Sequence, residues 1–478
     1  MEQYLLGIDL GTTGCKSMLF DLQGRILGSH YIEYGLIFTP EGVEQDAEEW
    51  WQNTCLCVSS AVKESGVDSR QIAALSISSQ GIAGVLVDEA GRPLYNALSW
   101  LDNRSTEEQE EMKALFGLDR IRLLTGKTKT DYSLPQLLWL KRRRPEMYQK
   151  AFKYLMPLDY LIFRMTGKAV TDYSMASGTL AFDIHSSRWI PDFFNGLDIP
   201  QNMVASLGAM GQPVGTLTED AARAMGLPSS VLVVLGAQDQ RCASLGAGIE
   251  PGVITISLGT ASAVCSLLPA PVADPENFVT CCGMDGSNWV LETTIGTVGA
   301  ALKWLRNTCM PGQSYDELNA LAEASAPGAG GLFFLPRLDR GKGSFIGLQL
   351  DTAPGDMVRA VMEGIAFIFR HHIESHERLA GPCRALRIFG GGSNSRIWLQ
   401  IIADITGKTV VRPRTHETGC LGAAILAGKG AGLIEDIYHA DSMVGAPSEV
   451  FYPNPANELL YAEAFKRSLQ LSEFIDKF

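Results

Sequence analysis

Residues 7–16 read Gly7-Ile8-Asp9-Leu10-Gly11-Thr12-Thr13-Gly14-Cys15-Lys16, and residues 256–262 repeat the pattern as Ile256-Ser257-Leu258-Gly259-Thr260-Ala261-Ser262. In both stretches an apolar run ends at Leu-Gly-Thr and a second apolar run follows, which predicts a strand, a tight turn and a strand. The N–H groups and hydroxyls of such a turn suit phosphate oxygens, because unpaired amides gathered in a nest carry partial positive charge. One turn in each half of the chain indicates two lobes that bind one polyphosphate.

The composition is that of a globular protein with more than one domain. The chain has 478 residues, 46% of them hydrophobic and 19% charged, and this length predicts two or three domains. No apolar run approaches the roughly 20 residues that cross a bilayer. The first residues lack a basic segment followed by an apolar core, so we expect no secretory signal, a cytoplasmic location and no membrane partner.

Charge and cysteine usage exclude two further classes. A net charge of −13 argues against a nucleic-acid partner, which requires a basic face. The one basic cluster, Lys141-Arg142-Arg143-Arg144, fits the solvated end of a helix. The ten cysteines show no zinc-site spacing, so we expect free thiols and no structural metal.

Hydrophobic periodicity predicts alternating strands and helices. The strands expected in the first half are Tyr4–Leu10, Cys15–Phe20, Arg25–Tyr34, Ile72–Ser78, Gly84–Asp88 and Val231–Leu235, with helices over Asp46–Glu64 and most of Thr106–Thr166. The glycine-rich segment Gly246–Gly252 is the expected boundary, because the strand, Gly-Thr turn and strand pattern restarts after it. The second half adds a strand at Leu386–Phe389 and helices at Ile397–Thr406 and Asn457–Phe478.

Two aspartates follow apolar strands, where an unpaired carboxylate is costly unless it meets solvent, a metal or a donor. Asp9 can hold Mg²⁺ through water, with Thr12, Thr13 and Lys16 on phosphates. Asp239 can accept the proton of an attacking hydroxyl. The alternatives are a plain hairpin turn at Asp9 and a helix cap at Asp239; taken alone, the two interpretations of Asp239 are evenly matched.

Polar residues also stand at the ends of strand-like segments, where ligands bind in open α/β sheets. Gln80, Trp100, Asp102 and Arg104 combine an aromatic ring with amide, carboxylate and guanidinium groups, which suits a polyhydroxy ligand. For Asp102 and Arg104 alone, a surface ion pair is the better interpretation.

The segment Gly390-Gly391-Gly392-Ser393-Asn394-Ser395 lies between an expected strand and an expected helix. Missing Cβ atoms would let a flat base lie against the backbone. The alternative is a strand-to-helix turn with Ser or Asn as the helix cap.

Together these segments resemble the FGGY family of carbohydrate kinases, within the actin, Hsp70 and sugar-kinase superfamily. The most specific match is Gly343-Ser344-Phe345-Ile346-Gly347-Leu348 followed by Asp356-Met357 and Ala360-Val361-Met362-Glu363. The resemblance implies that the two Gly-Thr turns bind phosphates and that Asp239 is the catalytic base. It also implies that Gly299 and Lys303 continue the nucleotide site and that Gly391, Gly392 and Ser395 contact adenosine.

The resemblance leaves the acceptor open. Xylulose kinases typically carry Met-His after the Ser-x-Gln segment and glycerol kinases carry Arg-Glu, whereas this chain has Gly81-Ile82 after Gln80. This departure disfavours glycerol. Tyr132 lies where a substrate-contacting Tyr occurs in glycerol kinases. D-Xylulose is the first expectation, and L-xylulose, ribulose, gluconate and erythritol stay open.

We therefore predict an α/β chain with the two-lobed actin-like ATPase (ribonuclease H-like) fold, a duplicated mixed sheet flanked by helices and a ligand cleft between the lobes. Residues 1–245 form the sugar-binding N-terminal lobe and residues 246–478 the nucleotide-binding C-terminal lobe. The predicted enzyme transfers the γ-phosphate of ATP to a small sugar, with Mg²⁺ held by Asp9 and Asp239. The alternative class is a non-enzymatic ATP switch, and the oligomeric state, a homodimer included, stays open.

Overall fold

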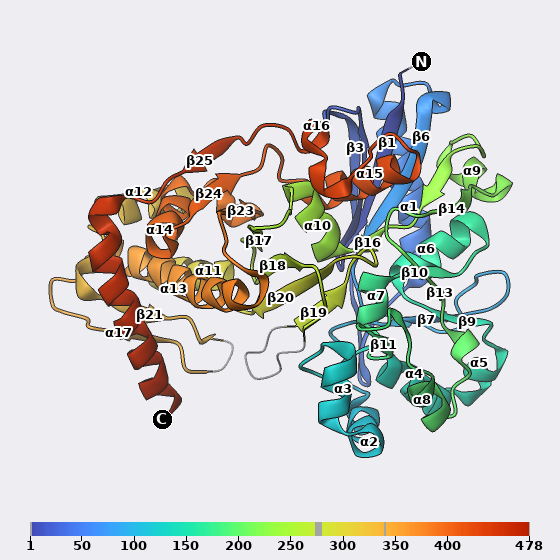
Figure 1. The fold of residues 1–478 in the computed structure, drawn as a ribbon, viewed down its shortest axis with the longest axis horizontal. Coiled ribbons are helices and arrows are strands. Elements are labelled where there is room, and N and C mark those ends of the chain that lie inside the picture. The colour runs from blue at the N-terminus through green and yellow to red at the C-terminus, as the bar shows by residue number, and fades with distance from the viewer. Residues whose placement is uncertain (1, 273–279, 339–340, 478) are drawn as a thin grey trace. The chain divides into compact units, whose positions relative to one another are not determined.

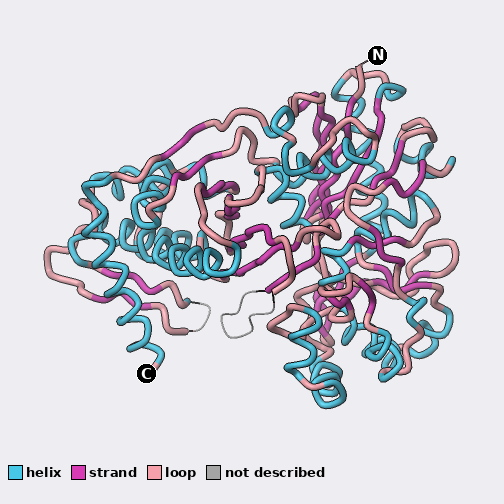
Figure 2. Tube along the Cα trace, viewed as in Figure 1, coloured by secondary structure: helices cyan, strands magenta, loops and turns pink. Residues whose placement is uncertain are grey.

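The computed structural model describes residues 2–272, 280–338 and 341–477, which form two compact units (Figures 1 and 2). The first unit comprises Met1–Gly248, Leu268–Val290 and Glu417–Gly445. The second comprises Ile249–Leu267, Leu291–His416 and Ala446–Phe478. Two segments from the second half of the sequence therefore belong to the first unit.

The first unit is built on a mixed seven-stranded sheet of order β14-β15-β6-β1-β2-β3, in which β16 also pairs with β6. Strand β1 is antiparallel to β2 and parallel to β6, and both β15 and β16 are parallel to β6. The carboxyl ends of four parallel strands thus meet at one edge of the sheet. The strands are β1 Tyr4–Leu10, β2 Gly14–Phe20, β3 Ile26–Glu33, β6 Ile72–Ser79, β14 Pro213–Thr216, β15 Leu232–Val234 and β16 Ala237–Gln238.

Helices cover both faces of this sheet. Helix α1 (Ala47–Ser65) begins after Asp46, whose carboxylate accepts a hydrogen bond from the Glu48 N–H, and ends at Gly66, whose φ is 67°. It packs on β2 and β3, with the Ala61 carbonyl against Gly28. Helix α15 (Thr418–Gly430) packs on β1, with the Cys420 carbonyl against Gly7 (Figure 1). Because the strand register places Gly7 and Gly28 on opposite faces, the two helices cover opposite sides.

The remaining elements of the first unit surround this sheet and are mostly short. The expected helical region 106–166 contains five helices and the small strand β9, which its hydrophobic pattern did not separate. The helices are α2 Thr106–Phe116, α3 Leu118–Thr125, α4 Ser133–Arg143, α5 Pro145–Lys150, α6 Pro157–Thr166, α7 Tyr173–Ser177, α8 Pro191–Gly196, α9 Glu219–Met225, α10 Asp239–Ala247 and α16 Asp441–Val444. The strands are β4 Ile37–Thr39, β5 Gly42–Gln45, β7 Val85–Val87, β8 Ala97–Leu98, β9 Lys153–Leu155, β10 Val170–Asp172, β11 Phe182–Asp183, β12 Arg188–Trp189, β13 Ser206–Gly208 and β19 Thr280–Gly283.

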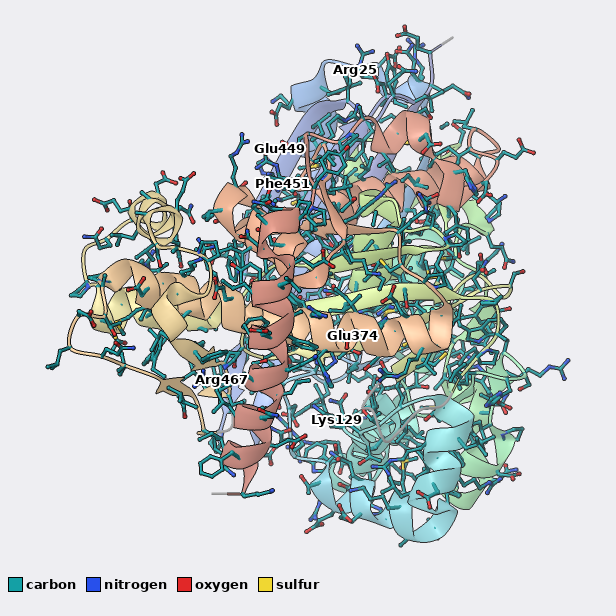
Figure 3. All side chains as sticks on the ribbon, turned by 60° about the vertical axis from the view of Figure 1, so that its left-hand side comes forward. Arg25, Lys129, Glu374, Glu449, Phe451 and Arg467 are labelled. Carbon is teal, nitrogen blue, oxygen red and sulfur yellow. The ribbon has the colours of Figure 1, made fainter. Side chains whose placement is uncertain are left out.

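The second unit repeats the arrangement around its own Gly-Thr turn. Strand β17 is antiparallel to β18 across that turn and parallel to β23, as β1 is to β2 and β6. The strand path runs β20-β18-β17-β23-β24-β25. On β25, Phe451 belongs to the core, and Glu449 forms an ion pair with Arg412. Figure 3 labels Glu449 and Phe451. Its elements are β17 Val253–Ser257, β18 Ser262–Leu268, β20 Trp289–Ile295, β21 Phe333–Leu335, β22 Ser344–Ile346, β23 Ala385–Phe389, β24 Thr409–Arg412, β25 Glu449–Phe451, α11 Gly299–Cys309, α12 Tyr315–Ala324, α13 Pro354–Ala380, α14 Arg396–Thr406 and α17 Glu458–Asp476.

Each unit has its own hydrophobic core, built from the apolar strand residues that the sequence pattern singles out. Trp50 of α1 packs with residues of β1 and β6 in the first core, and Trp398 of α14 packs with residues of β17 and β23 in the second. The predicted α/β class with a duplicated mixed sheet is confirmed. Within the described part of the chain, no helix combines the length and apolarity that a membrane crossing requires.

Close helix packing in the first unit gives a stability test. A Cβ at Gly422 of α15 would lie 1.8 Å from the Cys242 carbonyl oxygen of α10. Gly422→Ala should therefore lower the free energy of unfolding by about 1–3 kcal/mol, although Ala is otherwise favoured over Gly in a helix by about 1 kcal/mol. Urea denaturation measures this change. Gly35→Ala, where the new Cβ meets nothing within 4 Å, should not lower stability, and equal effects at the two positions would contradict the packing argument.

Candidate active site

Asp9 lies at the carboxyl end of β1, between Lys16 of β2 and Ser78 of β6 in the strand register. Its Oδ1 accepts a hydrogen bond of 2.7 Å from the Ser78 hydroxyl. Gly419 of α15 closes in on the other oxygen, because a Cβ there would lie 2.9 Å from Oδ2. Burial raises the pKa of Asp9, against the opposing effects of Ser78 and Lys16. This carboxylate stands at a crowded sheet edge where an ionic partner would stabilise it.

Asp239 reaches the same edge from the other side of β6. It is the first residue of α10 and follows β16, whose Ala237 and Gln238 pair with Ser78 and Ser79. The carboxylate accepts hydrogen bonds from the Gln240 N–H at 2.7 Å and from the Gln238 side-chain amide. It remains partly exposed. Burial, and next the charge of Asp9, raise the pKa of Asp239 to about 6. Asp9 and Asp239 therefore form an interacting pair of carboxylates.

This pair fits a divalent cation. Hard cations such as Mg²⁺ prefer carboxylate oxygens, and Mg²⁺ commonly takes one or two protein carboxylates together with substrate phosphates and water. The described residues include no group of three or more His, Cys, Asp and Glu side chains arranged to hold a metal ion by themselves. The donor set thus suits an ion shared with a phosphate-bearing ligand.

The first Gly-Thr turn is held by specific contacts. The Gly11 N–H donates to the Gly14 carbonyl at 2.9 Å, and the Trp100 indole N–H donates to the Thr12 hydroxyl at 2.9 Å. The Thr12 carbonyl accepts from the Gln45 amide at 2.8 Å. The Thr13 carbonyl accepts from the Tyr34 N–H. The turn and the half-exposed Trp100 ring are therefore one structural piece.

Lys16 follows the turn and pairs with Glu417, with 2.8 Å between its Nζ and the carboxylate. These two residues are 401 positions apart in sequence. The structure thus gives the expected phosphate-binding cation an internal counterion, which a phosphate would have to share or replace.

Gln80 follows β6 and presents a buried amide. The side chain is 2% exposed, and neither its amide nitrogen nor its amide oxygen has a hydrogen-bond partner among the residues described. Burying an amide without partners costs roughly 1–3 kcal/mol. The next residue, Gly81, lies beside Gln238, because a Cβ there would be 3.4 Å from the Gln238 side chain. The unpartnered amide therefore lies in the neighbourhood of Asp239.

Ile82 has a left-handed backbone, with a φ of 70°. This conformation is unusual for a β-branched residue and costs of the order of 1–3 kcal/mol. The Ser133 hydroxyl donates to the Ile82 carbonyl at 2.6 Å and fixes it beside α4. Tyr132, the residue before Ser133, is partly exposed, and burial raises its pKa to about 12. Gln80, Ile82, Tyr132 and Asp239 are thus drawn into one region of the first unit.

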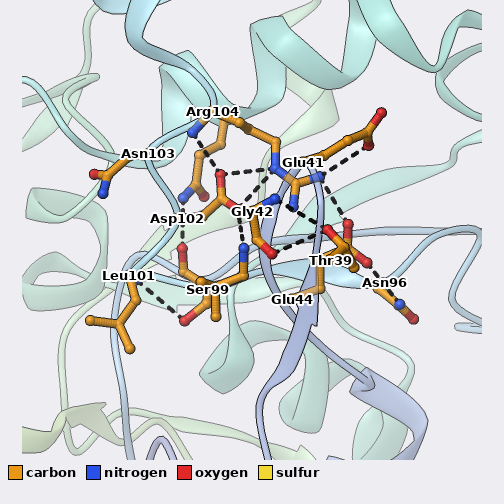
Figure 4. Close-up of polar contacts among 12 residues, drawn as sticks. Thr39, Glu41, Gly42, Glu44, Asn96, Ser99, Leu101, Asp102, Asn103 and Arg104 are labelled. Carbon is orange, nitrogen blue, oxygen red and sulfur yellow. Dashed lines mark hydrogen bonds and ion pairs between the residues drawn. The ribbon is translucent and has the colours of Figure 1, made fainter.

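Asp102 and Arg104 form a buried network and not a surface ion pair (Figure 4). The Arg104 side chain is 3% exposed and contacts Asp102 at 2.9 Å and Glu44 at 2.8 Å. Asp102 also accepts from the Val43 N–H at 2.6 Å and from the Arg104 N–H at 2.9 Å. The surface interpretation is wrong because Glu44, 58 positions before Asp102, adds the second carboxylate that allows the guanidinium to be buried. Both Asp102 oxygens are occupied, which favours a structural role.

The second unit gathers the residues expected to contact the nucleotide. The Gly259 carbonyl accepts from the Gly299 N–H at 2.9 Å, and a Cβ at Gly299 would lie 2.6 Å from that oxygen. The Thr260 carbonyl accepts from the Ala300 N–H, so α11 starts directly on the turn. Lys303 lies one helical turn further on and is exposed.

The glycines after β23 also contact the strand that leads into this turn. The Gly392 N–H donates to the Leu258 carbonyl at 2.8 Å, whereas nothing lies within 4 Å of a Cβ built at Gly391. The Ser395 hydroxyl bonds to Asn319 at 2.6 Å and accepts from the Trp398 N–H at the start of α14. Ser395 is therefore a helix cap, as the alternative interpretation held, beside an open backbone at Gly391.

Comparison with known proteins identifies the family. Residues 4–246 match the N-terminal domain of the FGGY family of carbohydrate kinases, and residues 254–431 match its C-terminal domain. The chain belongs to the FGGY family of carbohydrate kinases. The predicted enzyme class, an ATP:sugar phosphotransferase, is confirmed over the non-enzymatic switch.

The relatives of this FGGY kinase differ in the acceptors named for them. It is 31% identical to a xylulose kinase of Bacillus subtilis, over 97% of this chain and 95% of the relative. It is also 31% identical to a glycerol kinase of Thermococcus gammatolerans, over 98% of each chain. The crystal structure of a gluconate kinase from Lactobacillus acidophilus superposes with a TM-score of 0.91 at 25% identity, covering 99% of this chain and 98% of that one.

Sequence reasoning missed three residues of the region around Asp239 in this FGGY kinase. Arg241, Lys127 and Cys282 are all buried, and Arg241 interacts electrostatically with Asp239 and with the other two residues. Arg241 follows Asp239 by two positions and could have been noted as a cation beside the candidate base. Lys127 and Cys282 could not be identified from the sequence around them, because they are 155 positions apart and contact each other only in the folded chain.

The network around Arg104 gives a test of its role in this FGGY kinase. Asp102→Asn removes one partner of a buried ion pair and should lower the free energy of unfolding by about 3–5 kcal/mol, while the KM of the folded enzyme for its acceptor changes little. Denaturant unfolding and steady-state kinetics measure the two quantities. The control is Asp198→Asn, whose side chain is 99% exposed beside Lys141 and should change stability by at most about 1 kcal/mol. Unchanged stability with a raised acceptor KM would instead place Asp102 on the sugar.

Proposed function

We propose that the first unit transfers the γ-phosphate of ATP to a hydroxyl of a small sugar, with Asp239 as general base. The observation that carries this proposal is the pair of carboxylates beside the carboxyl end of β6. Asp239 is partly exposed, and its pKa of about 6 suits proton acceptance near neutral pH. The acceptor hydroxyl would donate its proton to Asp239 as its oxygen attacks the γ-phosphorus in line, with ADP as leaving group.

The protein's part in this reaction is mainly positioning and charge neutralisation. Mg²⁺, held by Asp9 and Asp239, would neutralise charge on the phosphoryl oxygens. Amides and hydroxyls of Gly11, Thr12 and Thr13, with Lys16, would bind the transferring phosphate. In the second unit, Gly259, Thr260, Gly299 and Lys303 would bind the remaining phosphates, and Gly391, Gly392 and Ser395 the adenosine.

The acceptor would meet Gln80, Gly81, Ile82, Trp100 and Tyr132. The buried, unpartnered amide of Gln80 supports a polar ligand here, because ligand hydroxyls can supply the hydrogen bonds it lacks. Similarity to xylulose kinases supports a pentulose such as D-xylulose as the first neutral acceptor to test. Similarity to a gluconate kinase supports a sugar acid as the first anionic one. L-Xylulose, ribulose and erythritol complete the panel.

The base assignment is tested by Asp239→Asn. This change keeps the size of the side chain but removes the proton acceptor, so turnover with any acceptor should fall by about 10²–10⁴-fold. ATP binding, measured by calorimetry, should persist. Asp198→Asn serves as the exposed control and should keep full activity. If Asp239→Asn retained the wild-type turnover, another group would have to be the base.

The metal assignment is tested by Asp9→Asn. Loss of this anionic oxygen ligand should shift the Mg²⁺ titration of activity to higher concentration or abolish activity, because a hard cation prefers a charged oxygen. The measurement is initial velocity against free Mg²⁺ at saturating ATP. An unchanged titration midpoint would remove Asp9 from the metal site and leave it a structural partner of Ser78.

A further inference from the structure

Lys127 is a buried cation with an unusual partner. The side chain is 6% exposed, and its Nζ donates to the Cys282 sulfur at 2.8 Å. It also lies 5.5 Å from the centre of the Tyr132 ring. Across the described ranges, no carboxylate oxygen lies within the 4.0 Å of Nζ that would make an ion pair, and the sulfur is its one hydrogen-bond acceptor. An ammonium has three N–H donors, so this one is poorly satisfied.

A second buried cation connects Lys127 to the base. Arg241 is 1% exposed, and its Nε donates to the Gln238 side-chain oxygen at 3.3 Å. The Gln238 amide nitrogen in turn donates to Asp239. Arg241 interacts electrostatically with Lys127 and with Asp239. A chain of interactions thus runs from Asp239 through Gln238 and Arg241 to Lys127.

The Cys282 thiol responds to both cations. Burial opposes its ionisation, but the charges of Lys127 and Arg241 outweigh burial and hold its pKa below the ordinary value. The Lys127 ammonium keeps its proton despite burial, because Cys282 and Tyr132 raise its pKa. The two positive charges that lower the pKa of this thiol would also stabilise an anionic group of a ligand beside them.

The amide of Gln80 is an independent sign that a ligand belongs in this region. It is nine-tenths or more buried and unpartnered, and its neighbour Gly81 lies beside Gln238. A ligand that places hydroxyls at Gln80 and Asp239 therefore lies beside Gln238, which Arg241 connects to Lys127.

We propose that the acceptor carries an oxyanion, the carboxylate of a sugar acid, which binds Lys127 while a hydroxyl of the same molecule faces Asp239. This inference rests on the proposed phosphoryl transfer and narrows its acceptor to an anionic sugar. A sugar phosphate offers the same oxyanion chemistry and is a separate arm of the test. The competing interpretation is that Lys127 and Cys282 form a self-sufficient pair that no ligand contacts.

The first experiment measures acceptor-dependent ADP release by the full chain with acceptors matched in length. D-Gluconate is compared with D-glucitol, D-xylonate with xylitol and D-xylulose, and D-glucose 6-phosphate is added as the phosphate arm. We expect kcat/KM for the sugar acids to exceed that for the neutral partners by at least about 10²-fold, as expected when a buried polar group loses its partner. A neutral acceptor used as well as its acid would overturn the inference but leave the phosphotransfer intact. A higher kcat/KM for D-glucose 6-phosphate than for the sugar acids would contradict the proposal that the anionic group is a carboxylate.

The second experiment uses Lys127→Met, which keeps the length of the side chain and removes its charge. KM for D-gluconate should rise about 10–100-fold, as for the loss of a hydrogen bond to a charged group, while Lys127→Arg recovers part of the loss. The control is Lys129→Met at a nearby exposed lysine (Figure 3), which should match the wild type. If the ratio of kcat/KM for D-gluconate to kcat/KM for D-glucitol were the same in Lys127→Met as in the wild type, the inference would be wrong.

A third measurement does not require catalysis. D-Gluconate should raise the melting temperature of the wild type and of Asp239→Asn, because a ligand that binds only the folded state stabilises it. D-Glucitol at the same concentration should not. Equal shifts from both compounds would overturn the inference even if Lys127→Met fails to fold. If no acceptor raises ADP release, the proposed phosphotransfer itself fails, and that result is separate from loss of the preference for an acid.

Discussion

Parallel pairing with β6 is the constraint on which the candidate site depends. Strand β1 ends at Asp9 and Leu10 beside Ser78 and Ser79, and β16 ends beside the same two serines just before Asp239. Three chain segments more than 60 residues apart therefore deliver their polar ends to one place. Because parallel strands share a carboxyl edge, two carboxylates that would repel each other in water are held together by the backbone ladder. The hydrogen bonds between the strands thus offset the repulsion between the Asp9 and Asp239 carboxylates.

Close backbone approach protects this arrangement. Gly236 admits the Ile77 carbonyl, Gly7 admits the Cys420 carbonyl and Gly246 admits the Thr418 carbonyl, each at a distance that leaves no room for a Cβ. The sheet and helices α10 and α15 are thus packed without intervening side chains immediately around Asp9 and Asp239. Interiors packed at this density do not deform gradually. The positions of the two carboxylates are accordingly fixed before any ligand binds.

Much of the fold could be predicted from the sequence because its signals are local. The two Gly-Thr turns, the helix expected over Asp46–Glu64 and the strand expected at Ile72–Ser78 are predicted from short stretches of sequence, and the structure has α1 at Ala47–Ser65 and β6 at Ile72–Ser79. The segments 268–290 and 417–445 could not be assigned to the first unit in this way, because they join it only through packing with residues far along the chain. The same distinction applies to the site. Asp9 and Asp239 could be predicted because each is an acidic residue that follows an apolar strand. The Lys16–Glu417 pair and the burial of Arg104 with Glu44 are properties of the folded chain.

Three energetically unfavourable features of the first unit belong to the proposed acceptor region. Gln80 leaves a buried amide without partners, Ile82 holds a left-handed backbone, and Lys127 places an ammonium against sulfur. Each costs stability, and each could be removed by an ordinary substitution such as Leu, Gly or Met. The Arg104 guanidinium, by contrast, has the carboxylates of Asp102, Glu44 and Glu41 within ion-pair distance, although its Nη2 has no hydrogen-bond partner among the described residues. At Arg104 the buried charge is neutralised by carboxylates of the protein, whereas among the described residues the Lys127 ammonium has only the Cys282 sulfur as acceptor. This difference is the physical basis of our proposal that a negatively charged group of the acceptor binds Lys127.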